Sequence, residues 1–136
     1  MGVTQADLTQ ALHTYFAPWV LSLGLTPVSQ TEQSVTLSLP VTAAVARAGG
    51  VLCGQAMMAA ADTAMALALM QHFGEFRPCT TVSQNSTFLK PLSGQDLLIT
   101  AKVLRAGKTM AFGQIDLCGA NDAKLVCQCT ATFALL

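Results

Sequence analysis

One carboxylate interrupts the most apolar segment of the chain. Asp62 is the only Asp, Glu, Lys or Arg between Arg47 and Glu75, and its neighbours are mostly Ala, Leu and Met. A carboxylate in apolar surroundings is costly unless it is solvated, paired or hydrogen-bonded. Such a group can attack an electrophilic carbon, or it can deprotonate the water molecule that does so. We therefore take Asp62 as a candidate catalytic residue, either as nucleophile or as general base.

Gly54 precedes this apolar run and stands where a helix should begin. The first backbone N–H groups of a helix have no partner within the helix. Because glycine has no side chain, a ligand oxygen can approach these groups closely. They can hold a carbonyl and stabilise the oxyanion that forms when the carbonyl is attacked. A glycine that merely belongs to the loop before a helix accounts for Gly54 equally well.

The spacing between the two residues limits how they could act together. Eight helical residues span about 12 Å, so one helix cannot bring Gly54 and Asp62 to the same carbonyl. Two copies of the helix that run antiparallel across a two-fold axis can do so. Catalysis by this pair therefore requires a homodimer. The structural alternative is that Asp62 is the N-cap of a helix that begins at Thr63.

Cys53 and three basic residues could also take part in a reaction. A thiol at a helix N-terminus can act as a nucleophile, although a free cysteine often serves only as a small buried side chain. Lys90, Arg105 and Lys108 flank predicted turns, where they could meet phosphate groups or simply be solvated. The segment GGVLCGQA is not a phosphate-binding loop, because Gln55 stands where such a loop requires Lys.

Residues 54–72 should form the helix that positions these groups. Ala, Met, Leu and Gln favour helices, and no helix-breaking residue occurs before Gly74. The segment is apolar on nearly every face, so the rest of the fold should surround it. The N-terminal segment 1–23 should contain an amphipathic helix over residues 5–21, with Leu8, Leu12, Tyr15 or Phe16, and Trp19 at helical spacing.

Most of the remaining chain shows the two-residue period of strands. Residues 33–41 alternate strictly between apolar and polar side chains. Four further segments of this kind occupy residues 79–90, 96–107, 109–119 and 124–135. The turns between the last three are typical of antiparallel hairpins. With no repeat or linker, we expect one domain over residues 1–136, of class α+β, in which a curved antiparallel sheet wraps around the long central helix.

Composition limits the classes of partner. Charged residues make up 10% of the chain, against roughly 25% in an ordinary soluble domain, and the net charge is zero. A surface so short of charge indicates contact with other copies of the chain, and the lack of basic runs argues against nucleic acid. Residues 51–70 are long enough to span a bilayer, but polar residues interrupt them, Asp62 above all, and we expect no membrane span.

The cysteines predict a reducing compartment. There are five, none in a CxxC pair or in zinc-binding spacing, so we expect no metal site. The first residues also lack the basic and apolar regions of a signal peptide. We therefore expect a cytoplasmic protein.

The sequence resembles the PaaI-type acyl-CoA thioesterases of the hotdog superfamily in three segments, which are CGQAMMAAADTAMALAL, TTVSQNSTFLKPLSGQDLLITAKVLRAGKTMAFGQIDL and KLVCQCTATFAL. The similarity covers residues 33–134, and the most specific part is N-x-x-F-L-x-P followed by G-x-D/E-L and R-x-G-K. The resemblance implies a hotdog fold, two subunits that share a continuous sheet, and often a homotetramer formed by two dimers. It also implies hydrolysis of an acyl-CoA or aryl-CoA thioester, with no metal and no cofactor besides the coenzyme A of the substrate.

The resemblance also implies roles for individual residues. Gly54 matches the glycine whose N–H polarises the thioester carbonyl. Asp62 matches the acid of the neighbouring subunit that attacks or directs water, and Thr81 matches a hydroxyl near the attacking water. The residues expected to bind substrate are Cys53, Gln55, Arg47, Asn85, Phe88, Lys90, Arg105, Gly107 and Lys108.

The chain departs from the family pattern at two places. Cys53-Gly54-Gln55 replaces the common His-Gly-Gly, and Arg47 replaces an Asn or Gln. The backbone donor and the acid remain, so thioester hydrolysis is the expected function. One alternative is an acyl-CoA-binding homo-oligomer without catalysis. Another is a hydratase or dehydratase on the same fold, which would need a catalytic His that residues 14–71 lack.

Overall fold

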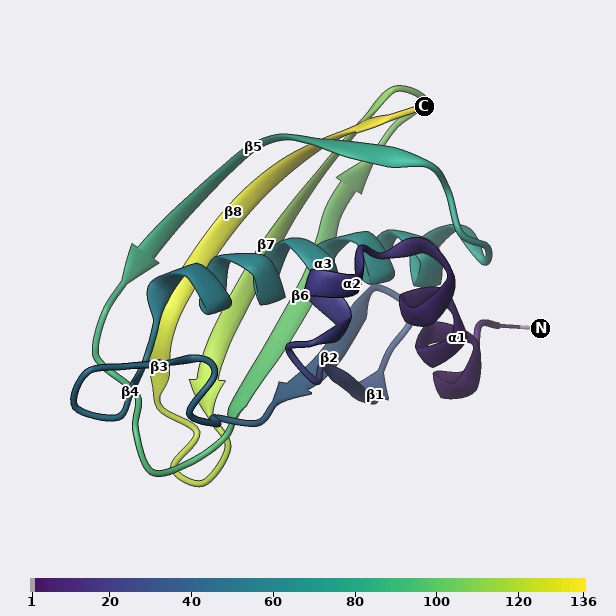
Figure 1. The fold of residues 1–136 in the computed structure, drawn as a ribbon. Coiled ribbons are helices and arrows are strands. Elements are labelled where there is room, and N and C mark those ends of the chain that lie inside the picture. Colours follow the sequence, from purple (N-terminus) through teal and green to yellow (C-terminus); the bar gives the residue numbers. More distant parts are fainter. Residues whose placement is uncertain (1) are drawn as a thin grey trace.

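A computed structural model describes residues 2–136, in which a curved sheet holds one long helix (Figure 1). Two short helices and a small hairpin complete the fold. In chain order the elements are α1 (Gln5–Tyr15), α2 (Pro18–Leu21), β1 (Thr26–Gln30), β2 (Ser34–Leu39), β3 (Ala46–Arg47), β4 (Val51–Leu52), α3 (Gly54–Phe73), β5 (Cys79–Phe88), β6 (Leu97–Ala106), β7 (Met110–Gly119) and β8 (Leu125–Leu135).

Six strands form one sheet in the order β1-β2-β6-β7-β8-β5, and every neighbouring pair is antiparallel. The sheet curves around α3, which runs along its concave side (Figure 1). The alternation predicted for residues 33–41 is present in β2, where Val35, Leu37 and Leu39 are fully buried against the helix side. The predicted architecture, a curved antiparallel sheet around a central helix, is confirmed.

The central helix has nearly the predicted bounds. It spans Gly54–Phe73 and ends where Gly74 adopts the left-handed conformation, at φ 82°. It passes through Asp62 without a break, and the Thr63 hydroxyl donates to the Ala59 carbonyl one turn back (2.8 Å). The interpretation of Asp62 as an N-cap is therefore wrong. Among the helices of residues 2–136, none combines the length and the hydropathy needed to cross a lipid bilayer.

One side of α3 is left open, although the sequence predicts a helix that is surrounded. Met58 is 41% exposed, Gln55 is exposed, and Ala59 and Asp62 are half-buried. These positions lie three or four residues apart and so form one stripe along the helix. Strand β5 is the last strand on its edge of the sheet, so no further strand of residues 2–136 lies beyond it to cover this stripe.

The prediction of a single helix over residues 5–21 is wrong. Helix α1 ends at Tyr15, and α2 begins at Pro18. Proline has no N–H to donate and holds the preceding Ala17 in an extended conformation (φ −62°, ψ 147°), so the helix cannot continue. Trp19 is consequently 60% exposed and does not share the buried face of α1. That face consists of Leu8, Ala11 and Leu12.

Three short strands, β1, β3 and β4, were not placed by the sequence pattern. Strand β1 contains Pro27, and its register with β2 shifts between Pro27 and Ser29. An edge strand tolerates proline because one side of it needs no ladder hydrogen bonds. Between β2 and α3, Arg47 pairs with Val51 in the small β3–β4 hairpin. This hairpin leads the chain directly into α3.

Candidate active site

The first turn of α3 has no side-chain cap. Cys53 is the N-cap residue in an extended conformation (φ −74°, ψ 149°), and its side chain accepts no capping hydrogen bond. The first helical bond joins the Met57 N–H to the Cys53 carbonyl (3.4 Å), which leaves three N–H groups, beginning with that of Gly54, without an acceptor in the helix. Helix α1, by contrast, begins with a complete capping box between Thr4 and Asp7.

A pocket of about 390 Å³ lies over this helix start. Besides the start of α3, its lining comes from the β3–β4 hairpin and from the end of β5 with the loop after it. A Cβ atom at Gly54 would lie 3.3 Å from two carbons of the Phe88 ring, so any side chain there presses on that ring. The lining residues are Arg47, Val51, Leu52, Gly54, Met57, Phe88, Leu89, Lys90 and Pro91.

The pocket, which we call the Gly54 pocket, is electropositive. Arg47 and Lys90 contribute two cationic side chains, and no Asp or Glu is part of the lining. The N-terminus of α3 adds the partial positive charge of a helix dipole. A carbonyl oxygen or an anion is the ligand that such a site favours. Of the predicted site residues, Gly54, Arg47, Phe88 and Lys90 meet here.

Asp62 lies apart from this pocket, about 12 Å along the helix from Gly54. The Thr81 hydroxyl of β5 donates a hydrogen bond to Asp62 Oδ1. Cys79 faces the same region, and burial together with the nearby Asp62 carboxylate raises the pKa of its thiol, which keeps the thiol protonated. Asp62 is only half-buried, so its carboxylate is held by one hydroxyl and still open to reactants.

A β-bulge in β5 decides which residues face α3. The register of β5 with β8 shifts between Thr81 and Ser83. Thr81 and Phe88 are seven residues apart and would lie on opposite faces of a regular strand. The extra residue of the bulge turns both towards α3. Asn85 pairs with the exposed Thr130, lies on the outer face of the sheet, and does not line the Gly54 pocket.

The remaining predicted residues are outside the Gly54 pocket of their own protomer. Cys53 is half-buried at the N-cap, and Gln55 is exposed.

The turn between β6 and β7 is located by the hydrogen bonds of Leu135. Leu135 pairs with Cys79 at the start of β5, and its N–H also donates to the carbonyl of Thr109 in the turn (2.8 Å). The β6–β7 turn therefore lies at the end of the sheet where β5 begins, opposite the end where β5 reaches Phe88. Of the predicted residues, Gly107 and Lys108 lie in this turn, and Arg105 lies near the end of β6 that leads into it.

Six residues near the site were not among the predicted site residues. Five of them line the Gly54 pocket, namely Val51, Leu52, Met57, Leu89 and Pro91. The place of Val51 and Leu52 just before the start of the helix was an available signal. Cys79 lies two residues before Thr81 and therefore on the same face of β5. Its position followed from strand periodicity once Thr81 was chosen.

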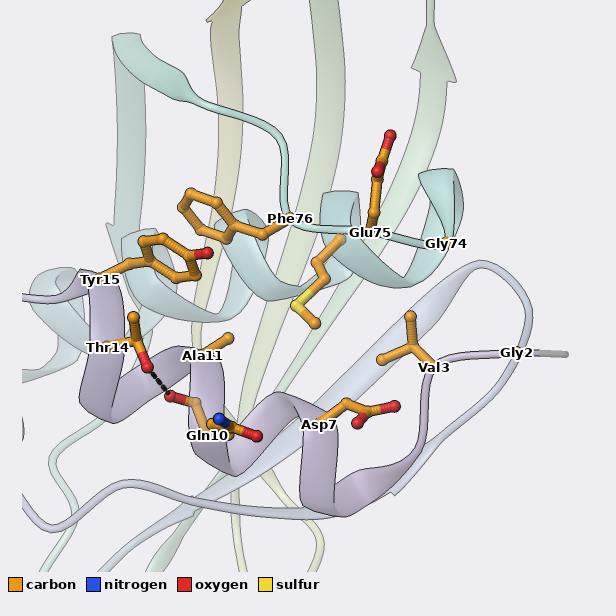
Figure 2. A pocket seen from close by; sticks show the side chains of 11 residues that line it. Gly2, Val3, Asp7, Gln10, Ala11, Thr14, Tyr15, Gly74, Glu75 and Phe76 are labelled. Atoms are coloured by element: carbon orange, nitrogen blue, oxygen red, sulfur yellow. Dashed lines mark hydrogen bonds between the residues drawn. The ribbon is translucent and has the colours of Figure 1, made fainter.

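A second pocket, of about 490 Å³, lies between α1 and the end of α3 and contains none of the predicted site residues (Figure 2). The Tyr15 and Phe76 rings stack at its border, with centroids 3.8 Å apart. Asp7 also borders it, but its carboxylate accepts the Thr4 N–H (2.9 Å) in the capping box of α1. Nowhere in residues 2–136 do three or more His, Cys, Asp or Glu side chains gather as metal ligands would.

Solved thioesterase structures share this architecture. The crystal structure of zebra fish thioesterase superfamily member 2 has a TM-score of 0.85 and 28% identity, over 98% of this chain and 99% of that one. A thioesterase from Haemophilus influenzae has a TM-score of 0.87 over 98% of this chain and 90% of that one. The two sequences are 23% identical, so this comparison shows a similar fold and nothing further. The architecture is the hotdog fold.

Similarity in sequence points to the same group of proteins. Human acyl-coenzyme A thioesterase 13 is 42% identical over 52 residues, which are 38% of this chain and 37% of the human protein. The mouse protein of the same name is 38% identical over 52 residues. The chain thus matches little more than a third of the length of these relatives.

A family model covers a larger part of the chain. The model of the thioesterase superfamily matches residues 49–126, which is more than half of the sequence. The matched segment includes the start of α3 at Gly54, the carboxylate of Asp62 and all of β5. By this match and by its fold, the chain belongs to the thioesterase superfamily.

Proposed function

We propose that this protein is an acyl-CoA thioesterase, which hydrolyses the thioester bond of an acyl-CoA or aryl-CoA. The observation that carries the proposal is the uncapped start of α3 at Gly54, open to an electropositive pocket, with the Asp62 carboxylate on the same helix. Membership of the superfamily and the likeness to acyl-coenzyme A thioesterase 13 support this reaction. The coenzyme A thioester is the substrate, and the proposed reaction uses no further cofactor.

In the proposed reaction the Gly54 N–H donates a hydrogen bond to the thioester carbonyl. This donor and the helix dipole stabilise the oxyanion that forms on attack. Asp62 of a second subunit either attacks the carbonyl carbon or takes a proton from the water that attacks it. Thr81 of that second subunit orients the carboxylate. If Asp62 has taken a proton from water, the carbon–sulfur bond of the adduct breaks, the carboxylic acid leaves, and the proton passes to the coenzyme A thiolate. If Asp62 has attacked the carbonyl carbon itself, the carbon–sulfur bond breaks to release the thiolate and leave an anhydride between the acyl group and Asp62. Water then hydrolyses this anhydride, which releases the acid, restores the Asp62 carboxylate and supplies the proton for the thiol.

Two subunits are proposed because one protomer keeps the reacting groups about 12 Å apart. Strand β5 is an edge strand of ten residues without a charged side chain, and most of it is exposed. An uncharged, uncovered edge of this length is suited to pairing with another strand. Antiparallel pairing of β5 with its own copy continues the sheet across a two-fold axis. It also sets the two α3 helices antiparallel, with Asp62 of one towards Gly54 of the other.

Exposed apolar side chains support contact at this edge. Val82, Phe88 and Leu89 are 56%, 48% and 53% exposed, and Met58 on the open stripe of α3 is 41% exposed. Apolar groups gathered along one edge are typical of an interaction surface. A second copy of the chain is the occupant that the low charge content favours.

The proposed pairing also accounts for the basic turn between β6 and β7. Strand β7 runs in the same direction as β5, since both pair antiparallel with β8. Reversing the second subunit therefore brings its β6–β7 turn to the end of the sheet where Gly54 of the first lies. Arg105 and Lys108 of that turn are then placed to meet the phosphates of coenzyme A. Association of two such dimers into a homotetramer, and a cytoplasmic location suited to five free cysteines, remain part of the proposal.

Thiol release from a panel of short-chain, long-chain and aromatic coenzyme A esters tests the reaction. We expect the protein to release coenzyme A from at least one class with a kcat/KM on the order of 10⁴ M⁻¹s⁻¹ or higher. Equilibrium dialysis on the same esters supplies the comparison. Binding without thiol release would contradict the proposal and favour the non-catalytic acyl-CoA-binding homo-oligomer.

Mixing two inactive variants tests whether one site draws on two subunits. Asp62→Asn and Gly54→Pro are unfolded together in equal amounts and refolded. Half of the resulting dimers are then heterodimers, and a heterodimer has one site with an intact Gly54 and an intact Asp62 and one site in which both are replaced. Since half of the dimers have one of their two sites intact, we expect about a quarter of wild-type thioesterase activity. Each variant refolded alone is the control. Activity no higher than in these controls would place both groups of a site in one subunit and contradict the shared site.

A further inference from the structure

We propose that the acyl group of the substrate ends in a carboxylate and that Arg47 binds this carboxylate, an inference that rests on the proposed thioesterase function. The Gly54 pocket holds two of the seven basic residues of the chain, Arg47 and Lys90. It holds no acidic residue. The assigned substrate class is therefore a coenzyme A monothioester of a short dicarboxylic acid.

The positive charge in this pocket exceeds what a thioester needs. A thioester carbonyl is neutral, and the N–H groups at the start of α3 are sufficient to hold it. Arg47, Lys90 and the helix dipole together contribute about two and a half positive charges. The Asp62 carboxylate of a partner subunit neutralises one of these. A second anionic group in the pocket would balance much of the remainder.

The phosphates of coenzyme A are too distant to be that second anion. About thirteen bonds separate the thioester sulfur from the nearest phosphorus, which is roughly 15 Å when the chain is extended. A sphere of the volume of the Gly54 pocket is only about 9 Å across. An anion bound in the same pocket as the carbonyl therefore belongs to the acyl half of the molecule, because the nearby part of the pantetheine arm is uncharged.

Arg47 has the chemistry and position for this contact. Its guanidinium can donate two parallel hydrogen bonds to one carboxylate, a geometry that lysine lacks. It is exposed at the β3–β4 hairpin and so has freedom to extend over the pocket. Leu52, Met57 and the Phe88 ring provide apolar lining for the methylene groups between the carbonyl and the carboxylate. An acyl chain of four to five carbons has about the length of the pocket.

Binding of two matched thioethers tests this inference without turnover. S-(4-carboxybutyl)-coenzyme A and S-pentyl-coenzyme A have five-carbon chains that differ at the terminal group, and neither can be hydrolysed. By calorimetry we expect the wild-type protein to bind the carboxylated compound at least about tenfold more tightly. Arg47→Gln should reduce the preference to within about twofold. Lys102→Gln, which removes an exposed charge from β6, should retain it.

Two binding results would overturn the inference. One is an absent or reversed preference in the wild-type protein. The other is an equal loss of affinity for both ligands in Arg47→Gln. That result would show that Arg47 contacts the coenzyme A moiety, which the two ligands share. Thiol release from glutaryl-coenzyme A and pentanoyl-coenzyme A is measured in parallel. Release from neither ester, with the binding preference intact, would count against the proposed hydrolysis while leaving carboxylate recognition by Arg47 standing.

Discussion

Replacing Asp62 with asparagine is expected to lower kcat for thioester hydrolysis by a factor of at least about 10² while leaving the protein folded and its subunits associated. Asparagine has nearly the same size as aspartate, and its amide oxygen can still accept the hydrogen bond from Thr81. The variant therefore removes the nucleophile or base and little else. Thiol release gives kcat, and light scattering of the eluted protein gives the oligomeric state.

A matched variant separates the catalytic role of Asp62 from a general loss of charge. Asp116 of β7 is a half-buried carboxylate that accepts hydrogen bonds from Gln128 (2.9 Å) and Gln114 (3.3 Å). Asp116→Asn makes the same chemical change on another part of the sheet and should keep kcat within about twofold of wild type. Hydrolysis by Asp62→Asn at the wild-type rate would show that another group attacks the thioester or activates water.

Replacing Gly54 with proline is expected to lower kcat by about 10² to 10³ relative to Gly54→Ala, because proline removes the N–H that polarises the carbonyl. Gly54 is the first helical residue, a position that proline favours in helices. Cys53 already has the extended conformation that a residue before proline requires (φ −74°, ψ 149°). The substitution therefore deletes one donor at a point where the helix tolerates it.

Alanine is the matched control because it retains the N–H. Both variants place a Cβ atom 3.3 Å from the Phe88 ring, so both require the same small shift of that ring. The ratio of their rates therefore reports the replacement of the N–H by the proline Cδ rather than the contact of Cβ with the Phe88 ring. Circular dichroism and thermal melting of the two proteins should agree closely. Equal rates for folded Gly54→Pro and Gly54→Ala would show that the Gly54 N–H does not stabilise the oxyanion.

Much of the fold was predictable because its elements are long and strongly patterned. Helix α3 was expected over residues 54–72 and spans Gly54–Phe73, since its helix formers continue up to a glycine that ends it. Strand β8 places Cys127, Cys129 and Phe133 on one buried face, as a two-residue period requires. Here local sequence and burial favour the same structure.

The errors occur where one residue outweighs a pattern. The apolar spacing of residues 5–21 continues past Pro18, but the ring of that proline ends the helix. Similarly, the alternation of β5 gives no sign of the bulge between Thr81 and Ser83. Because of that bulge, Asn85 lies on the outer face of the sheet while Phe88 packs over Gly54. Such a shift depends on pairing with β8, which lies far away in the sequence.

Residue type and period are local properties, and from them the class of fold, the long apolar helix and the two candidate reactive groups on that helix were predictable. The sequence also placed Gly54 and Asp62 too far apart on one helix to act on one carbonyl. Folding of the whole chain was needed to bring Arg47, Phe88 and Lys90 together around Gly54, to join the Thr81 hydroxyl to Asp62, and to leave β5 as an uncovered edge. These facts depend on which distant strands pair and on where a bulge shifts their register. Hydrophobic periodicity indicates which face of a strand is buried, but it does not identify the neighbouring strand.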